Sequence, residues 1–369
     1  MTSHSTRPCR FGLLTTITAM AFAGEAKPVP ADFLQADEDE AKAVAELKGL
    51  KVSCIQLIGK KWDVSLQKGH VTEKGLIKPE VAGPIQKLRG IRQFSADFVQ
   101  LSDAGLETIK GLPGLESLNV SDNDITDAGL VHLKGLSQLR DLNLSLAYYL
   151  NKPGIAITDQ GLAQLKDLKQ LETLSLDNCS ITDSGLSALK DMKRMQRLRL
   201  QNTKITDAGP AHLAGMTSLE SLDLLGTQVK GAGLANLKGL TKLKHLIVSQ
   251  CPVDDEGLSG LKHTAKLKSL ELSETKITDA GLAHLKDLPD LIMIRLSKTA
   301  VSDAGLASLA ALPKLEEIWL NETKVTSDGL TQLTASKSLK SLWLTKKATT
   351  PEALKSLQKA LPKLQFHLL

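Results

Sequence analysis

The sequence is poor in aromatic residues. Phe, Trp and Tyr make up 3% of its 369 residues, so any core must be built from aliphatic side chains. No run of about 18 apolar residues occurs, and we therefore expect no transmembrane segment. Of its four cysteines, Cys54, Cys179 and Cys251 lie beyond the first 23 residues, and an odd number does not build a disulfide framework. Neither sign of charge dominates, since 46 basic and 41 acidic residues are intermixed, and we expect no nucleic-acid partner.

The N-terminal 23 residues differ from the rest of the chain. Arg7 and Arg10 precede an apolar run over residues 11–23, which ends in Ala-Phe-Ala. A basic start, an apolar middle and a small-x-small ending are typical of a secretory signal peptide. We therefore expect residues 1–23 to be a signal peptide and the protein to be secreted, periplasmic or part of the cell envelope. Because threonines interrupt the apolar run, the alternative is a frayed N-terminus on a cytoplasmic protein.

Leucine is abundant, with 68 residues, and it is arranged in a repeat. The phrase Ile-Thr-Asp-x-Gly-Leu, or a close variant, recurs at steps of 24 residues, except that 32 residues separate the copies at Ile125 and Ile157. A further copy opens at Val71, 30 residues before the next. The array therefore holds about 12 repeats, with insertions near residues 77–90 and 146–153.

One complete unit, residues 171–186, reads LETLSLDNCSITDSGL, and the general form is LxxLxLxx(N/T/C)x(I/V)TDxGLxxLxxLxx. This pattern resembles the leucine-rich repeat family over about residues 62–369. The 24-residue variant is similar to repeats of secreted or cell-envelope proteins of planctomycete-type bacteria, to ribonuclease-inhibitor-like repeats and to those that follow F-box domains, although no F-box precedes them here. The resemblance implies an α/β fold: a right-handed leucine-rich-repeat solenoid with a parallel sheet on its concave face and short helices on its convex face.

The spacing within each unit agrees with that fold. Leu174 and Leu176 alternate and so share one face of a short strand, and strands of successive turns pair in parallel about 4.8 Å apart. The small or polar residue that follows each strand, such as Asn123, can bond backbone groups there. Thr126 is a candidate N-cap, and Asp127 lies where the dipole of the following helix favours an anion.

The N-terminal edge of the array should be closed by a segment that is not a repeat. We expect residues 24–61 to form a linker and a cap. The cap would hold an amphipathic helix over 37–50 and a strand near 52–57, with Trp62 packed in its core. The repeats would then span 62–360.

The C-terminal residues 361–369 match the start of another repeat and should add a capping strand with an edge near His367. The longer insertion, near 146–153, carries Tyr148 and Tyr149, the only tyrosines. Inserted loops on a repeat scaffold often contact partners. The alternative is a tolerated surface loop whose tyrosines pack back on the rim.

No catalytic constellation is recognisable: the sequence has no phosphate-binding glycine loop, H-E-x-x-H, G-x-S-x-G or C-x-x-C. His132, His212 and His284 share a helical column but lie several turns apart, too far to share a metal ion. One aspartate per turn supplies fewer oxygens than calcium needs. Cys179 and Cys251 are three turns apart, roughly 14 Å, and cannot form a disulfide. We therefore expect no enzymatic activity, no cofactor and no metal.

The outward positions of the sheet follow from the period. The central column is predicted to run Asn119, Asn143, Ser175, Arg199, Asp223, Ile247, Glu271, Arg295, Trp319, Trp343, and the flanking column Ser117, Asp141, Thr173, Arg197, Ser221, His245, Ser269, Met293, Glu317, Ser341. Trp319 and Trp343 would lie on adjacent strands at stacking distance, with Arg295 beside them, a composition typical of binding hot spots. The alternative is that the tryptophans fold flat over their neighbours or lie under the C-terminal cap.

We therefore predict a non-enzymatic scaffold that recognises a protein, or a glycan, through residues 245–345 of the concave face. One rival function is a structural cell-envelope protein without a specific ligand. Another is a substrate-recognition subunit, by analogy with F-box-associated repeats. The candidate contact residues are Trp319, Trp343, Arg295, Met293, Ile247, Glu271, Glu317, His245, Tyr148 and Tyr149.

Overall fold

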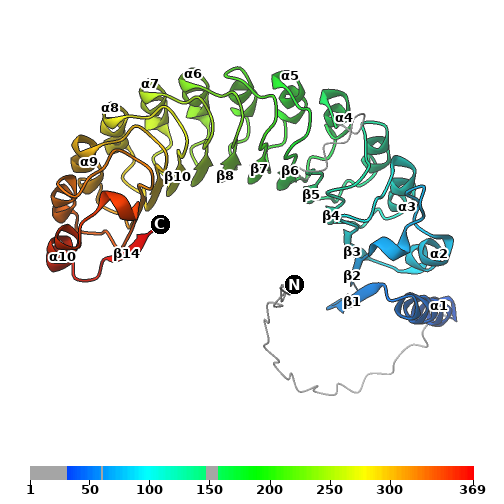
Figure 1. The fold of residues 1–369 in the computed structure, drawn as a ribbon. Coiled ribbons are helices and arrows are strands. Elements are labelled where there is room, and N and C mark those ends of the chain that lie inside the picture. Colours follow the sequence, from blue (N-terminus) through cyan, green and yellow to red (C-terminus); the bar gives the residue numbers. More distant parts are fainter. Residues whose placement is uncertain (1–30, 60, 147–156) are drawn as a thin grey trace, which may run out of the picture.

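The computed structural model describes residues 31–59, 61–146 and 157–369, with side chains from residue 38 onward. These residues form an open solenoid that curves as an arc, with strands along the inner, concave face and helices along the outer, convex face (Figure 1). The predicted α/β solenoid is thus confirmed. The expected signal peptide, residues 1–23, and the tyrosines of the longer insertion, Tyr148 and Tyr149, lie outside the described residues.

Across the described ranges, 14 strands form one sheet and follow one another in sequence order. β1 (Ser53–Leu57) pairs antiparallel with β2 (Lys61–Ser65), and every later pair is parallel, as expected when each turn adds one strand. The other strands are β3 (Ile91–Ser95), β4 (Ser117–Asn119), β5 (Asp141–Asn143), β6 (Thr173–Ser175), β7 (Arg197–Arg199), β8 (Ser221–Asp223), β9 (His245–Ile247), β10 (Ser269–Glu271), β11 (Met293–Arg295), β12 (Glu317–Trp319), β13 (Ser341–Leu344) and β14 (Gln365–Leu368).

The convex face carries mostly short helices, and none in this part of the chain is long and apolar enough to cross a bilayer. The α-helices are α1 (Ala31–Gly49), α2 (Pro79–Lys87), α3 (Glu107–Lys110), α4 (Asp159–Gln164), α5 (Asp183–Leu186), α6 (Gly231–Ala235), α7 (Asp255–Ser259), α8 (Asp279–Leu282), α9 (Leu306–Ala310) and α10 (Pro351–Ala360). The 3-10 helices are η1 (Lys68–His70), η2 (Asp103–Leu106), η3 (Gly129–Leu133), η5 (Ser187–Leu189), η6 (Gly209–Leu213), η7 (Asn236–Gly239), η8 (Gly260–His263), η9 (Ala283–Asp287), η10 (Asp303–Gly305), η11 (Gly329–Ala335) and η12 (Lys346–Ala348). The shorter predicted insertion is α2, a nine-residue helix where most turns have four or five.

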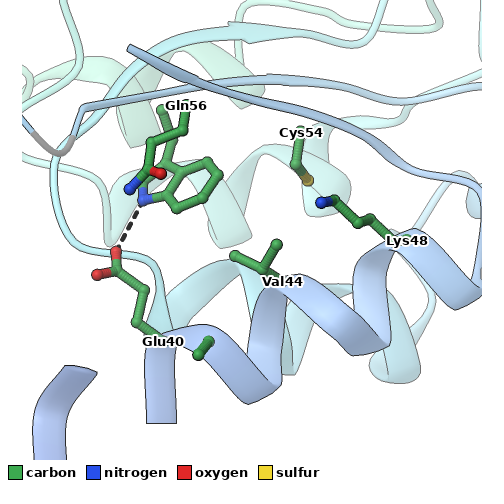
Figure 2. Close-up of a pocket in the computed structure, with 7 residues that line it drawn as sticks. Glu40, Val44, Lys48, Cys54 and Gln56 are labelled. Atoms are coloured by element: carbon green, nitrogen blue, oxygen red, sulfur yellow. Dashed lines mark hydrogen bonds between the residues drawn. The ribbon is translucent and has the colours of Figure 1, made fainter. Parts of the chain in front are cut away.

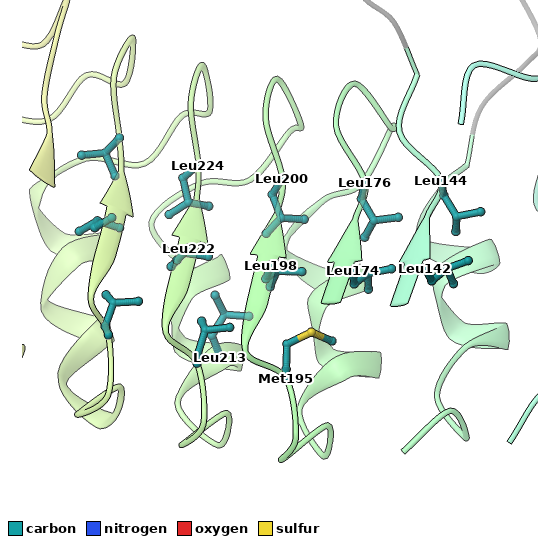
Figure 3. Packing of buried hydrophobic residues seen from close by; sticks show 14 of the residues in the cluster. Leu142, Leu144, Leu174, Leu176, Met195, Leu198, Leu200, Leu213, Leu222 and Leu224 are labelled. Carbon is teal, nitrogen blue, oxygen red and sulfur yellow. The ribbon is translucent and has the colours of Figure 1, made fainter. Parts of the chain in front are cut away.

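The core is a continuous column of aliphatic side chains (Figure 3). Leu174 and Leu176 are both fully buried, and Leu174 lies in register with Leu142 on one side and Leu198 on the other. Burying one leucine side chain contributes about 1.5–3 kcal/mol. Because each turn covers the leucines of its neighbours, the array is stabilised as a whole and not turn by turn.

Polar side chains close the turn after each strand, as the sequence predicts. Oδ1 of the buried Asn123 accepts hydrogen bonds from the backbone N–H groups of Val99 and Leu101, and Nδ2 donates to the carbonyl oxygens of Ala96 and Val120. Threonines at this position donate their hydroxyl to the carbonyl oxygen three residues earlier: Thr203, Thr227, Thr275, Thr299 and Thr323. Cysteines at this position are buried free thiols: Cys179 and Cys251.

The aspartate of the Thr-Asp-x-Gly motif braces one turn against the next, a role that was not predicted, while most of these aspartates also lie in the first turn of their own helix. Asp159 accepts hydrogen bonds from the backbone N–H and the hydroxyl of Thr182 in the next turn, at 2.8 and 2.5 Å. Two such bonds outweigh the weaker attraction to a helix dipole. The same brace joins Asp103 to Thr126, Asp127 to Thr158, Asp183 to Thr206, Asp255 to Thr278, Asp279 to Ser302 and Asp303 to Thr326.

Thr126 takes part in a brace and also accepts a hydrogen bond within its own turn. Its hydroxyl donates to Asp103 and accepts a hydrogen bond from the Ala128 N–H at 3.3 Å. The helix that follows, η3, is of the 3-10 type and begins at Gly129, later than an N-cap at Thr126 implies. Thr158 and Thr278, by contrast, are N-caps whose side chains accept a hydrogen bond from the first turn of α4 and α8.

The N-terminal end is covered by α1 and the β1–β2 hairpin (Figure 1). Trp62 is buried there, and its Nε1–H donates a 2.8 Å hydrogen bond to Oε1 of the buried Glu40 on α1 (Figure 2). The same oxygen accepts a hydrogen bond from the Arg89 N–H. A cavity of about 390 Å³ lies between α1 and β1, lined by Val44 and Cys54 among others (Figure 2).

Candidate functional site

Equal positions of successive turns line up on the concave sheet, because neighbouring strands pair in register. Ile247 lies beside Glu271, Glu271 beside Arg295, Arg295 beside Trp319, and Trp319 beside Trp343. The predicted central column is therefore a line of side chains that crosses β9 to β13. Its members come from residues almost a hundred positions apart in the sequence.

Four planar side chains of this column form one stack. The Trp319 and Trp343 ring centroids are 3.9 Å apart, with an interplanar angle of 11°. The guanidinium carbon of Arg295 lies 4.5 Å from the centroid of a Trp319 ring, a cation–π contact. On the other side, His367 of β14 stacks on Trp343 with the centroids 3.9 Å apart and the planes at 13°. We call these four residues the tryptophan patch.

His367 was not predicted to belong to the site, although a strand edge was expected near it. Counting 24 residues onward from Trp343 would have found it, and the two residues are in register. The LPKL motif points elsewhere: matching residues 361–364 to 312–315 puts Leu368 in the column instead. The difference arises between the motif and the strand: β12 begins two residues after Leu315, whereas β14 begins one residue after Leu364.

Two carboxylates hold the patch in place. Glu317 Oε1 accepts a 2.5 Å hydrogen bond from Trp319 Nε1–H, and Glu271 pairs with Arg295 Nη1 at 3.2 Å. Trp319, Trp343, Arg295 and Glu317 are all half-buried. One face of Trp343 thus lies against His367 of the C-terminal capping strand, and both tryptophans remain partly exposed to solvent.

The remaining predicted residues lie to the N-terminal side of the patch. Ile247 is half-buried, two strands before Arg295, and Met293 is half-buried with its Sδ 3.9 Å from Ser269 Oγ. His245 is largely exposed, and partial desolvation of its ring, together with the nearby Lys244 and Lys268, lowers the pKa of the imidazole. The structure thus brings eight of the ten predicted residues onto one surface; the other two are Tyr148 and Tyr149.

A polar network in the middle of the sheet was not predicted. Asp177 Oδ2 pairs with Arg199 Nη2 at 2.7 Å, and Asp223 Oδ2 accepts a 2.5 Å hydrogen bond from Gln201 Nε2. Both carboxylates are buried, and burial raises the pKa of Asp177. These residues lie in neighbouring outward columns, so the period could have placed them together. Their mutual pairing leaves them engaged with one another.

The structure offers little for catalysis or for metal binding. Among the residues that it describes, no group of three or more His, Cys, Asp or Glu side chains could hold a metal ion. Burial raises the pKa values of the Cys179 and Cys251 thiols, so these side chains are poor nucleophiles. What the concave face offers is a rigid, partly apolar surface for contact.

Comparison with known proteins agrees with the fold. One leucine-rich repeat family model matches residues 169–229, and another matches residues 113–133, 239–262 and 263–285. No curated protein matches the chain.

Among solved structures, an internalin (inlF) from Listeria monocytogenes has a TM-score of 0.50 and 18% sequence identity, with 84% of this chain and 94% of that chain covered. An internalin C2 (inlC2) from the same organism has a TM-score of 0.40 and 25% identity over 65% of this chain and 83% of that one. Taken together, the 24-residue repeat, the one-strand-per-turn sheet and the family matches show that the chain carries leucine-rich repeats.

Proposed function

We propose that the protein is a non-enzymatic scaffold that recognises a protein partner through the C-terminal half of its concave face. The tryptophan patch is the observation that supports this proposal. Leucine-rich repeats present an extended concave surface to their partners, and Trp and Arg often dominate the binding energy of an interface. A partner that covers the half-buried rings of Trp319 and Trp343 would remove apolar surface from water.

The surroundings of the patch suit a specific interface. Glu271, Glu317 and His245 supply polar contacts beside the apolar side chains of Met293 and Ile247, so polar and apolar groups alternate next to the tryptophans. The Tyr148 and Tyr149 loop is proposed as a second contact. The stack also packs β14 against β13, which a structural envelope protein without a ligand could use, so the pull-down below separates the two functions. A substrate-recognition subunit would be one form of the proposed scaffold.

Export belongs to the same proposal. The basic start, apolar middle and Ala-Phe-Ala ending of residues 1–23 support a cleaved signal peptide. Partners are therefore sought first in the envelope and secreted fractions of the native host.

A pull-down from those fractions tests the proposal. The baits are the full chain, the Trp319→Ala/Trp343→Ala double variant, and an Asn119→Ala/Asn143→Ala control in the polar half of the same column. Circular dichroism and thermal unfolding verify the fold of each bait. We expect a protein partner that the native chain and the asparagine control retain and the tryptophan variant loses. Identical lists for all three baits would refute recognition through the patch.

A further inference from the structure

Unpaired polar atoms gather at the tryptophan patch. Within the described part of the chain, six buried side-chain N and O atoms have no hydrogen-bond partner, and four of them belong to Arg295 (Nε), Asn321 (Nδ2 and Oδ1) and Trp343 (Nε1). Asn321 is only 6% exposed and lies in the turn that follows β12, two residues beyond Trp319. A buried polar group without a partner is costly, and a cluster of them at one surface indicates a ligand that supplies the missing partners.

The indole N–H of Trp319 has a hydrogen-bond partner and that of Trp343 has none, and the neighbouring residues explain the difference. Trp319 Nε1 donates to Glu317, which lies two residues before it on β12. The equivalent residue on β13, two before Trp343, is Ser341, whose side chain is two carbons shorter. Trp343 Nε1 therefore keeps a free N–H in a nearly parallel, stacked ring.

The stacking also limits what can bind. One face of Trp319 is covered by Arg295 and the other by Trp343, whose second face is covered by His367. A sugar ring binds to an aromatic face, and these indole faces are occupied. The ring edges, which carry partial positive charge, remain for a ligand, and they favour carbonyl oxygens and aromatic faces.

We propose that the patch binds an extended peptide segment of its partner by its main chain, an inference that rests on the proposed function. The Asn321 amide has a donor and an acceptor side by side, as a peptide group requires: Nδ2 donates to a carbonyl oxygen and Oδ1 accepts from an N–H. Trp343 Nε1 and Arg295 Nε donate to further carbonyl oxygens. Because these atoms are buried in the free chain, binding includes a rotation of the side chains that cover them, and tryptophan fluorescence reports it.

Phage-displayed random dodecapeptides provide the probe. They are selected on the full native chain and counter-selected on the Trp319→Ala/Trp343→Ala variant, so that the retained peptides depend on the patch. Each retained peptide is then synthesised with its backbone N–H groups methylated one at a time. We expect methylation at one position to weaken binding to the native chain about tenfold, and the same methylation to have no effect on binding to Asn321→Leu.

Variants of the chain separate recognition from folding. Asn321→Leu removes no hydrogen bond from the free chain, so its melting temperature should be unchanged or higher while its affinity for the peptides falls about tenfold. Ser341→Glu gives Trp343 Nε1 an internal acceptor and should weaken binding as well. Asn143→Leu and Ser221→Glu, the same changes on strands away from the patch, should leave affinity unchanged.

Several results would overturn the inference. Peptides that need the tryptophans but bind Asn321→Leu and every methylated form equally well refute the main-chain contact and leave the proposed function standing. A selection without patch-dependent peptides refutes peptide recognition, as does patch-dependent binding of chitopentaose or cellopentaose. The proposed function itself is refuted by a different result, a pull-down in which the retention of no protein depends on Trp319 and Trp343.

Discussion

At the scale of single residues, the glycine of the Thr-Asp-x-Gly motif fits the aspartate of the preceding turn. A Cβ on Gly185 would overlap the Asp159 carboxylate, and the same holds for each braced pair. Gly185 has no positive φ, so its conformation is open to any residue. The motif therefore pairs residues of two turns: the aspartate braces, and the glycine makes room for it.

We expect Gly185→Ala to destabilise the chain by about 1–3 kcal/mol, because Asp159 can move aside only by giving up its bonds to Thr182. The higher helix propensity of alanine, about 1 kcal/mol, opposes this loss but does not cancel it. Urea unfolding followed by circular dichroism measures the difference. Gly135, which has no neighbouring atom within 4 Å of the position of a Cβ, is the control. If Gly135→Ala costs as much as Gly185→Ala, the steric explanation is wrong.

At the scale of strands and helices, ion pairs and aspartate braces join neighbouring turns of the solenoid. Oppositely charged side chains pair across successive strands, as in Arg140 with Glu172 and Lys244 with Glu220. Each exposed pair contributes little, about 0–1 kcal/mol. The series of braces changes at two successive steps among the described turns from α4 to η11. The Asp207 carboxylate accepts only from the backbone N–H groups of Lys230 and Gly233. Gly231 then stands where the others have aspartate, and Asp254 accepts from Gly257 N–H within its own turn.

The network that joins β6, β7 and β8 predicts a dependence on pH. Burial raises the pKa of Asp177, an effect larger than the opposing one of Arg199. The folded chain therefore holds this proton more tightly than the unfolded chain, where the pKa is about 3.9. The resulting stabilisation is complete below about pH 3.9 and is lost as pH rises through the raised pKa. Relative to the native chain, Asp177→Asn should gain free energy of unfolding as pH rises.

For Asp159→Asn we expect the opposite dependence of the free energy of unfolding on pH. Burial of Asp159 acts to raise its pKa, but hydrogen bonds from Thr182 and Ser184 outweigh that effect and lower it. Its stabilisation is present above about pH 3.9 and is lost as pH falls, so this variant should fall behind the native chain as pH rises. Urea unfolding of both variants at several values between about pH 3 and pH 7 gives the two slopes. If the two variants change in the same direction relative to the native chain as pH rises, at least one of the two assigned pKa shifts is wrong.

Much of the array could be predicted at this scale, because one period determines both strand register and core face. The burial of Leu174 and Leu176 could be predicted from the alternation within a strand. The hydrogen bonding of Asn123 could be predicted from its position after a strand. The role of Asp159 could not be predicted so simply, since spacing within one turn does not reveal a partner in the next. The columns found Trp319 and Trp343, but the shorter spacing between Leu364 and β14 meant that the motif did not identify His367.

At the scale of the whole molecule, the solenoid is held by contacts between neighbours, so its ends need separate protection. Glu40 links α1 to Trp62 and to the Arg89 N–H. Replacing it with leucine leaves a buried indole N–H and a backbone N–H unpaired, at a cost of about 2–4 kcal/mol.

We expect Glu40→Leu to expose the first turns and leave the last ones unaffected. Amide hydrogen exchange should lose protection in β1 to β3, while β10 to β13 keep it. Glu40→Gln, which retains the accepting oxygen, is the milder control. An equal loss of protection along the whole chain would show that the cap does not act locally.

The aspartate brace also gives the array a direction and makes one 24-residue turn the unit by which it can lengthen or shorten. Each aspartate reaches forward to the turn that follows, and every braced turn offers the same threonine or serine and glycine to the one before it. Whole 24-residue modules can therefore be duplicated or deleted during evolution without a mismatch at the junction, whereas a shift of a single residue breaks a brace. The four-membered stack is sensitive to such an event, because an extra module between β12 and β13 would part its two indoles.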